Sequence, residues 1–245
     1  MTTYRWNMSD AAETFDAAAP AIHPLYLAVQ DEILRLLGEK PQPPQCVVDL
    51  GGGSGRLLER VLERFPESHV VLVDQSPAFL AIAERRLAKF GARVTLIEKS
   101  LQDDWPAVLP SEPDALVSMS AIHHLEPAEK QSLYHKCYET LAPDGLLLNG
   151  DELRLPSDAE YLAAMKWWVQ QKELAIAEGR IPESFRPRTV AWRERNITRF
   201  GEPKSSGDDC HETAAVQEEY LRQAGFRDVG VPWREQLWGV LFGRK

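Results

Sequence analysis

A glycine-rich turn between an apolar segment and an amphipathic one constrains this chain more than any other feature. Residues 47–50 form a short apolar run around Asp49, and residues 51–55 read Gly-Gly-Gly-Ser-Gly. Apolar residues then recur at helical spacing until Pro66. Glycines let a backbone turn sharply and approach a ligand closely, which is typical of the carboxyl end of a parallel strand. The turn therefore predicts an α/β fold with a ligand site above it.

The segments around this turn alternate between strand-like and helix-like patterns. Continuous apolar runs predict strands at residues 47–50, 70–73, 94–97, 115–119 and 146–148. Helical patterns lie between them, the clearest at residues 57–65, 77–90 and 127–141. Apolar strands that alternate with helices indicate a parallel sheet covered on both faces.

Two regions depart from this alternation. Residues 25–37 mark one amphipathic helix inside an N-terminal helical segment, residues 1–40. Residues 152 to about 205 contain no convincing strand, and Ser157 with Glu160 forms a capping-box pattern that opens a helix there. The chain then ends with a helix at about 213–224 and strands at about 226–233 and 237–243. We expect a single domain, 1–245, in which residues 152–205 form a helical cap insertion.

Charge and composition exclude several classes of partner. The net charge of −9 argues against a general nucleic-acid or anionic-membrane surface, because phosphate binding needs clustered cations. The three cysteines lie far apart without a CxxC pair, which excludes a cysteine-built zinc site and fits a reducing compartment. Residues 1–16 lack the pattern of a signal peptide, and every apolar run is shorter than a membrane span. We expect a cytoplasmic protein with no nucleic-acid and no membrane partner.

An acidic residue closes the second predicted strand. Asp74 follows the run at 70–73 and could accept both ribose hydroxyls of a nucleoside. Its alternative role is a helix N-cap before Pro77. The turn does not match a dinucleotide fingerprint, since Arg56 stands where the third glycine of GxGxxG belongs.

The pattern Asp49-x-Gly51-x-Gly53-x-Gly55 instead resembles the first motif of class I S-adenosylmethionine-dependent methyltransferases. The resemblance implies a Rossmann-like, doubly wound, seven-stranded sheet whose last strand is antiparallel. It also implies S-adenosylmethionine as cofactor, S-adenosylhomocysteine as product, and a small-molecule acceptor bound by a monomer or homodimer. Two other functions stay open: a sister enzyme that modifies the methionine moiety of S-adenosylmethionine, and a non-catalytic regulator that binds it.

The resemblance also implies which residues contact the cofactor. Ser100 occupies a position where the family often has an acidic residue, so the adenine contact departs from the usual pattern. The predicted cofactor-binding residues are Tyr26, Asp49, Gly51, Gly52, Gly53, Asp74, Gln75, Ser100, Leu101, Ser118 and Met119.

Histidines follow the fourth predicted strand. His123 is a candidate general base, with a structural role as the alternative. We predict no metal site at His123 and His124, because adjacent side chains point apart and no third ligand has a suitable spacing. Residues 208–212 also contain ligand types, but acids before a predicted helix are more often caps.

The expected cap segment is locally basic, and its charge suggests the kind of acceptor. Residues 180–199 carry six arginines against two glutamates, a local charge of +4 (six minus two). Arginine suits bidentate binding of carboxylate or phosphate, so the acceptor could be a small organic acid or a phosphorylated metabolite. The alternative is a solvated helical face with surface ion pairs. Four tryptophans could line an apolar pocket or belong to the core: Trp167, Trp168, Trp192 and Trp233.

Overall fold

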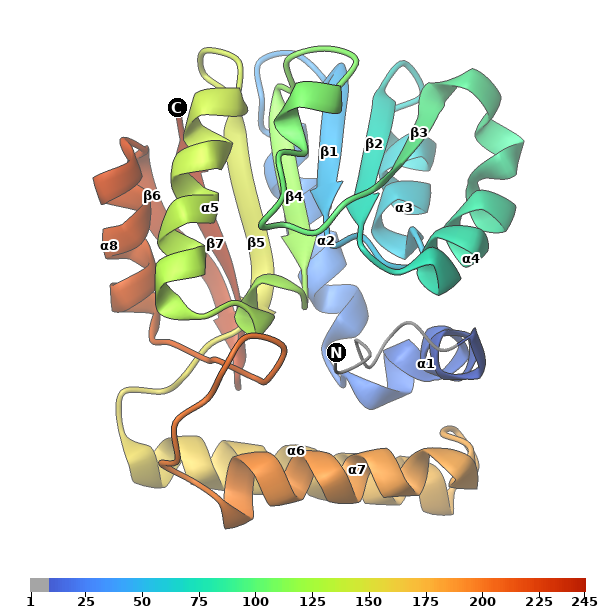
Figure 1. The fold of residues 1–245 in the computed structure, drawn as a ribbon, viewed down its shortest axis with the longest axis vertical. Helices are drawn as coiled ribbons and strands as arrows, with labels where there is room; N and C mark the ends of the chain where they lie inside the picture. The colour runs from blue at the N-terminus through green and yellow to red at the C-terminus, as the bar shows by residue number, and fades with distance from the viewer. Residues whose placement is uncertain (1–8) are drawn as a thin grey trace.

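The computed structural model describes residues 9–245, so expectations for residues 1–8 lie outside the described part. A seven-stranded sheet with the order β3-β2-β1-β4-β5-β7-β6 forms the centre (Figure 1). Five strands are parallel to one another, and β7 is antiparallel to both β5 and β6. The strands are β1 (Cys46–Leu50), β2 (His69–Asp74), β3 (Val94–Glu98), β4 (Ala115–Met119), β5 (Leu146–Glu152), β6 (Arg227–Glu235) and β7 (Trp238–Arg244). The expected seven-stranded Rossmann-like fold is confirmed.

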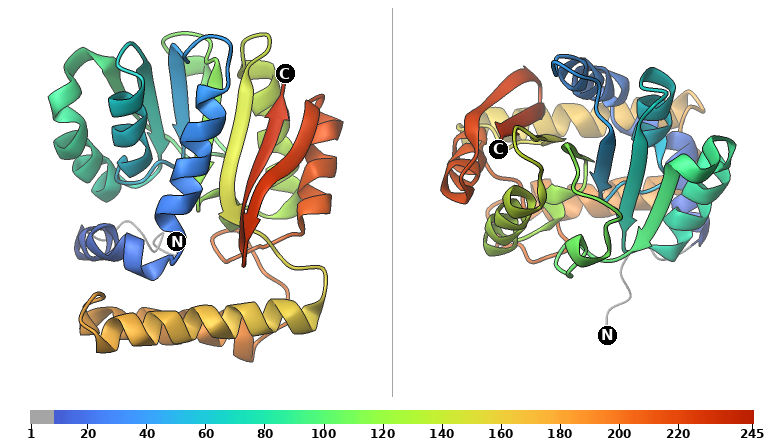
Figure 2. Two further views of the ribbon diagram at one scale, coloured as in Figure 1. Left: turned by 180° about the vertical axis from the view of Figure 1, so that it is seen from behind. Right: turned by 90° about the horizontal axis from the view of Figure 1, so that it is seen from above.

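Helices cover both faces of this sheet (Figures 1 and 2). On one face α2, α3 and α4 pack on alternate strand residues such as Val47 and Val70; on the other, α5 and α8 pack on Val48 and Val71. Alternation of strand side chains between two apolar layers explains why these strands read as continuous apolar runs. The helices of these layers are α2 (Tyr26–Gly38), α3 (Arg56–Arg64), α4 (Pro77–Leu87), α5 (Pro127–Thr140) and α8 (Ala214–Ala224).

A third layer lies across the carboxyl ends of the parallel strands, at the bottom of Figure 1. It contains α6 (Asp158–Ala177) and α7 (Arg186–Arg193), followed by a π-helical turn (Glu194–Thr198), and we call residues 153–213 the cap. The Ser157 hydroxyl accepts a hydrogen bond from the Glu160 backbone, so the predicted N-cap of α6 is confirmed. Apart from one β-bridge between Arg154 and Thr213, the cap contains no strand.

The cap is part of the main core, not an appended module. Tyr161, Met165 and Trp168 of α6 are buried in the same apolar cluster as the strands. Trp168 packs edge-on against Trp238 of β7, and its indole nitrogen donates to the Ile22 carbonyl at 2.7 Å. Deleting the cap would therefore expose core side chains.

The N-terminal segment contains one more helix than the sequence pattern predicted. Helix α1 (Ser9–Ile22) precedes α2 and lies beside the cap. Its buried side chains are mostly alanines such as Ala18, and Pro20 lies inside it, so it lacks the large apolar stripe that revealed α2. It nevertheless packs against both α4 and α6.

Short 3₁₀ turns complete the connections, at Ala88–Arg93, Pro106–Val108, Ile122–His124 and Glu183–Phe185. Within residues 9–245, no helix combines the length and apolar character needed to cross a membrane.

Candidate active site

A cavity of about 530 Å³ lies between the carboxyl ends of the strands and the helices α1, α6 and α7. The glycine turn lines one end of it, and cap residues line the other. Ten of the eleven predicted cofactor-binding residues line this cavity: Tyr26, Asp49, Gly51, Gly52, Gly53, Asp74, Gln75, Ser100, Leu101 and Met119. The structure thus brings together residues that are up to 93 positions apart (Tyr26 to Met119).

The glycine turn is shaped by backbone constraints that only glycine meets. Gly51 and Gly53 have φ values of +70° and +53°. A Cβ at Gly51 would lie 2.5 Å from the Ala121 side chain, and one at Gly52 would lie 2.8 Å from the Asp49 carboxyl group. The turn therefore holds its backbone directly against Asp49 and against the loop after β4.

Asp49 is a buried carboxyl group inside the cavity wall. Its side chain is 1% exposed, and Oδ1 has no hydrogen-bond partner among the described residues. Burial, reinforced by the Asp74 carboxylate, raises the pKa of Asp49 to about 8. An unpaired buried carboxyl is costly, so this position is suited to a ligand that brings a positive charge or a donor.

Asp74 is held at the end of β2 by backbone donors. Its Oδ2 accepts from the Gly53 amide at 2.9 Å and its Oδ1 from the Ser76 amide at 2.8 Å. Burial raises the pKa of Asp74, and these amides partly offset that effect. The side chain that caps α4 is Ser76, which accepts from the Phe79 amide, so Asp74 is not the helix cap.

Ser118 does not lie in the cavity lining. Its side chain is fully buried and donates to the Leu50 carbonyl at 2.7 Å, which ties β4 to β1 beneath the turn. The lining residue that the sequence analysis missed is Ser120, two positions later, with a positive φ of 51°. Its hydroxyl is buried without a hydrogen-bond partner in the described chain. A non-glycine residue in this conformation is strained, and such residues cluster at functional sites.

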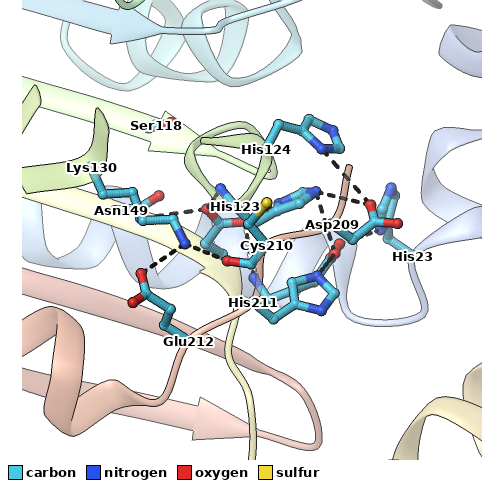
Figure 3. Close-up of polar contacts among 12 residues, drawn as sticks. His23, Ser118, His123, His124, Lys130, Asn149, Asp209, Cys210, His211 and Glu212 are labelled. Carbon is cyan, nitrogen blue, oxygen red and sulfur yellow. Dashed lines mark hydrogen bonds and ion pairs between the residues drawn. The ribbon is translucent and has the colours of Figure 1, made fainter. Parts of the chain in front are cut away.

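A polar cluster forms the floor of the cavity beneath the cap (Figure 3). His123 is 4% exposed, and its Nδ1 lies 2.6 Å from Asp151 Oδ1. Its Nε2 faces Glu152 Oε2 at 3.6 Å and Asp209 Oδ1 at 3.7 Å. Burial alone would lower the pKa of His123, but these three carboxylates outweigh it and raise the pKa to about 9.

The raised pKa bears on the predicted role of His123. The surrounding carboxylates favour the protonated imidazole, which has no lone pair to accept another proton. A ligand that neutralises these carboxylates would free that lone pair, and the role of His123 as a general base stays a prediction.

The segment that carries the glycine turn matches a known family model. Residues 47–145, which contain the glycine turn, Asp74 and His123, match the family model described as a methyltransferase domain. Residues 47–145 thus form a methyltransferase domain. The matched segment begins after α2 and ends before the cap.

Curated relatives of the methyltransferase domain act on different substrates. Trans-aconitate 2-methyltransferase of Acidovorax sp. (strain JS42) is 32% identical over 143 residues, 56% of this chain and 52% of the relative. Demethylmenaquinone methyltransferase of Chlamydia caviae is 30% identical over 165 residues, which are 62% of this chain and 65% of the relative. Carboxy-S-adenosyl-L-methionine synthase of Campylobacter lari is 24% identical over 145 residues, covering 59% and 60%. The chain thus spans about half the length of the trans-aconitate relative.

Solved structures share the fold of the methyltransferase domain. An O-methyltransferase family protein from Burkholderia thailandensis superimposes with a TM-score of 0.63 at 18% identity, covering 96% of this chain and 59% of that chain. Human N-acetylserotonin methyltransferase, solved with S-adenosylmethionine, gives 0.58 at 16% identity, covering 94% and 57%. At 18% and 16% identity, these structural similarities show that the chain shares the fold.

Residues 208–212, just before α8, have a different role from the predicted one. Thr213, not an acid of residues 208–212, caps α8 by accepting from the Val216 amide. Asp209 is instead buried in the cavity lining. Residues 208–212 therefore return under the cap as part of the site, a contact across about 85 positions from His123 that local sequence patterns cannot reveal.

The cap contributes aromatic and basic side chains to the cavity of the methyltransferase domain. Lys172 of α6 is 3% exposed, and its ammonium lies 4.0 Å from the ring centre of Trp168 and 4.1 Å from that of Trp192. Burial lowers the pKa of Lys172 to about 8, against the opposing effect of Glu152 and Asp209. Trp168 and Trp192 line the cavity and also belong to the main apolar cluster, whereas Trp167 and Trp233 pack against that cluster.

Only part of the arginine-rich segment reaches the cavity. Arg188 and Arg195 line it. Arg186 forms surface ion pairs with Glu173 and Glu183, and Arg199 pairs with Glu202. The alternative interpretation of a solvated face is therefore correct for Arg186 and Arg199.

Proposed function

We propose that this protein binds S-adenosylmethionine at the glycine turn and transfers its methyl group to a small molecule held beneath the cap. The observation that carries the proposal is the carboxyl group of Asp49 in the cavity lining, whose buried Oδ1 has no hydrogen-bond partner among residues 9–245. S-adenosylmethionine carries a sulfonium and an ammonium group, and either cation would compensate this carboxylate.

The residues present fit the cofactor along its whole length. Asp74 can accept ribose hydroxyls, the turn at Gly51–Gly53 leaves room for the methionine part, and Ser100 with Leu101 borders the adenine end. The cofactor supplies an already activated methyl group, so the protein's contribution is to align acceptor, methyl and sulfur and to exclude water. This explains why the site holds a well-formed binding end and needs few reacting side chains.

The cap end favours an acidic acceptor. Arg188 and Arg195 bring cationic forks to the cavity, and the Trp168–Trp192 pair provides apolar walls. Two of the relatives described above are named for acting on an organic acid or a quinone precursor, and the arginines favour the acid. The proposal therefore places a carboxylate or phosphate of the acceptor near Arg188.

Replacing Arg188 with Gln should raise the KM for an acidic acceptor at least tenfold, the effect of losing about 1.5 kcal/mol from a charge-assisted hydrogen bond. Cofactor affinity should not change, because Arg188 lines the cap end of the cavity. Arg186→Gln is the matched control, since Arg186 is held in surface ion pairs. Steady-state kinetics on both variants measure the effect, and an equal KM in the two would remove Arg188 from the acceptor site.

The function itself is tested by following the methyl group. The protein should bind S-adenosylmethionine and S-adenosylhomocysteine, but not NAD, with micromolar affinity, about −8 kcal/mol by calorimetry. With methyl-labelled cofactor and a pool of small organic acids, label should appear in an acceptor while S-adenosylhomocysteine accumulates.

Two other outcomes would replace this proposal. A donor altered on its methionine part, without S-adenosylhomocysteine, would indicate a donor-modifying enzyme, the activity for which the Campylobacter lari relative is named. Tight binding with no product from any acceptor pool would indicate a regulator.

A further inference from the structure

Four side chains from separate parts of the chain converge at the floor of the cavity. They are His123 after β4, Glu152 at the end of β5, and Asp209 and His211 on the segment that leads to α8. His123, Glu152 and His211 each offer one ligand atom within 4.8 Å of the others, and His123 does so again with Asp209 and His124. Figure 3 shows His123, Asp209 and His211 gathered at this point.

One atom of each histidine is held by a second partner, which leaves the other directed at the cluster. His123 Nδ1 bonds to Asp151, so Nε2 is the atom that faces Glu152 and Asp209. His211 Nδ1 bonds to the Tyr161 hydroxyl at 2.5 Å, so Nε2 is the atom that faces Glu152 Oε2 at 3.0 Å. Metal-binding histidines are characteristically oriented in this way, through a carboxylate or another group on the second nitrogen.

The carboxylates are arranged in the same manner. Asp209 Oδ2 accepts from the Asn196 side chain at 2.7 Å and lies 3.7 Å from Arg195, while its Oδ1 is turned towards His123. Glu152 is 2% exposed, and its Oε1 lacks a hydrogen-bond partner in the described residues. Together with Asp151, three carboxylates are buried within this small volume, and a divalent ion that displaces the proton of His123 would compensate them in its place.

We propose that His123, Glu152 and His211 form a binding site for one divalent transition-metal ion, with the Asp209 carboxylate beside His123. Metal–nitrogen and metal–oxygen bonds of about 2.0–2.2 Å place neighbouring ligand atoms about 3.0–3.5 Å apart. The His211–Glu152 distance of 3.0 Å lies in that range, and the His123–Glu152 distance of 3.6 Å needs only a small contraction to reach it. Two imidazoles with one carboxylate favour Fe²⁺, Mn²⁺, Co²⁺ or Zn²⁺ over Mg²⁺ and Ca²⁺, which prefer all-oxygen sites.

The position of the site suggests what the ion does. His123, Glu152 and Asp209 line the cavity, whereas His211 lies behind them. An ion held by His123, Glu152 and His211 would keep its open positions on the cavity side, where oxygen atoms of a small acid or hydroxy acid can coordinate. This role rests on the proposed function, but the binding of the ion does not.

Metal binding is tested on the full-length protein without reference to activity. After treatment with a chelator and dialysis, the wild-type protein is titrated with Mn²⁺ and separately with Co²⁺. We expect one ion per chain, measured by elemental analysis after removal of free metal, and visible absorption bands from bound Co²⁺. Metal should also raise the unfolding temperature, since an ion that binds only the folded state stabilises it.

Variants separate this site from adventitious binding. Glu152→Gln keeps the side-chain volume and should weaken Mn²⁺ binding at least 100-fold. Asp151→Asn keeps the side-chain shape but removes the negative charge beside His123 Nδ1, and should weaken binding about 10- to 100-fold. His135→Gln is the matched control, because His135 is an exposed histidine on α5, and its affinity should equal that of the wild type.

Some outcomes would overturn the proposal. They are absence of stoichiometric binding in the folded wild-type protein, no Co²⁺ bands, or equal loss of metal in the His135→Gln control. If a ligand variant does not fold, the wild-type stoichiometry and Co²⁺ spectrum decide the question alone. A protein that binds metal but transfers no methyl group would contradict the proposed function and leave the metal site standing.

Discussion

Replacing Asp49 with Asn is expected to weaken S-adenosylmethionine binding by about 1.5–3 kcal/mol, roughly ten- to 150-fold, while stabilising the ligand-free protein. The two effects share one cause. The buried carboxyl group has an oxygen without a partner, which favours a cationic ligand but disfavours the empty folded state. Asparagine has the same shape but carries no charge. It therefore needs no compensating cation in the empty protein and attracts no cationic ligand.

The pH dependence of the free energy of unfolding provides a second test of the Asp49 carboxyl group. Its pKa is about 8 when folded against 3.8 for the free side chain, so the folded state binds the proton more tightly. Stability is therefore highest below pH 4 for this group and falls as the pH rises to 8, by several kcal/mol at most, at about 1.4 kcal/mol per pH unit. The Asp49→Asn variant should lack this fall.

Calorimetry and urea unfolding from pH 5 to 8 measure both effects. Asp104→Asn changes an exposed acid outside the cavity lining and is the control, which should match the wild type. Unchanged cofactor affinity in a folded Asp49→Asn protein would show that the carboxyl does not contact the cofactor.

The metal-free protein is expected to lose roughly 3 kcal/mol of stability between pH 6.5 and 9 through His123. The pKa of His123 is raised from 6.5 to about 9 when folded. A raised histidine pKa stabilises the protein fully below pH 6.5, and this contribution disappears as the pH rises through 9. The physical reason is that a neutral imidazole no longer compensates Asp151, Glu152 and Asp209.

Imidazole NMR titration of the chelator-treated protein should place the midpoint for His123 near pH 9. Urea unfolding should show a shallower pH slope for His123→Gln than for the wild type, with His135→Gln retaining the wild-type slope. A midpoint near 6.5 would mean that the carboxylates do not hold the proton.

The sheet was predictable from the sequence because its signals are local. Runs such as residues 70–73 are apolar on both faces, and turns and caps such as Gly225 mark the ends of helices. Helix α1 was not predicted, because its contacts with α4 and α6 rely on small side chains and carry no strong periodicity.

The cofactor end of the site was predictable for a similar reason. Asp49 and Asp74 end or adjoin strands that pair in register, so two strand ends place them side by side. The cap end of the site was not predictable from the sequence. His123, Glu152 and His211 come from three separate segments and meet because the chain after the cap returns to the end of β5. Ligand spacing within one segment argues against a metal at His123 and His124, but it carries no information on partners from distant segments.

Helix α1 touches both ends of the cavity, and this has a consequence for how the two ligands communicate. Asp16 bonds to Arg56, the first residue after the glycine turn, and to Arg86 of α4. Further along the helix, Ala18 and Ile22 pack against Ala175 and Ile176 of the cap. A ligand at either end that orders α1 leaves less conformational entropy to be lost when the second ligand binds. Donor and acceptor would then bind with positive cooperativity through α1, in addition to the contact between the acceptor and the methyl group.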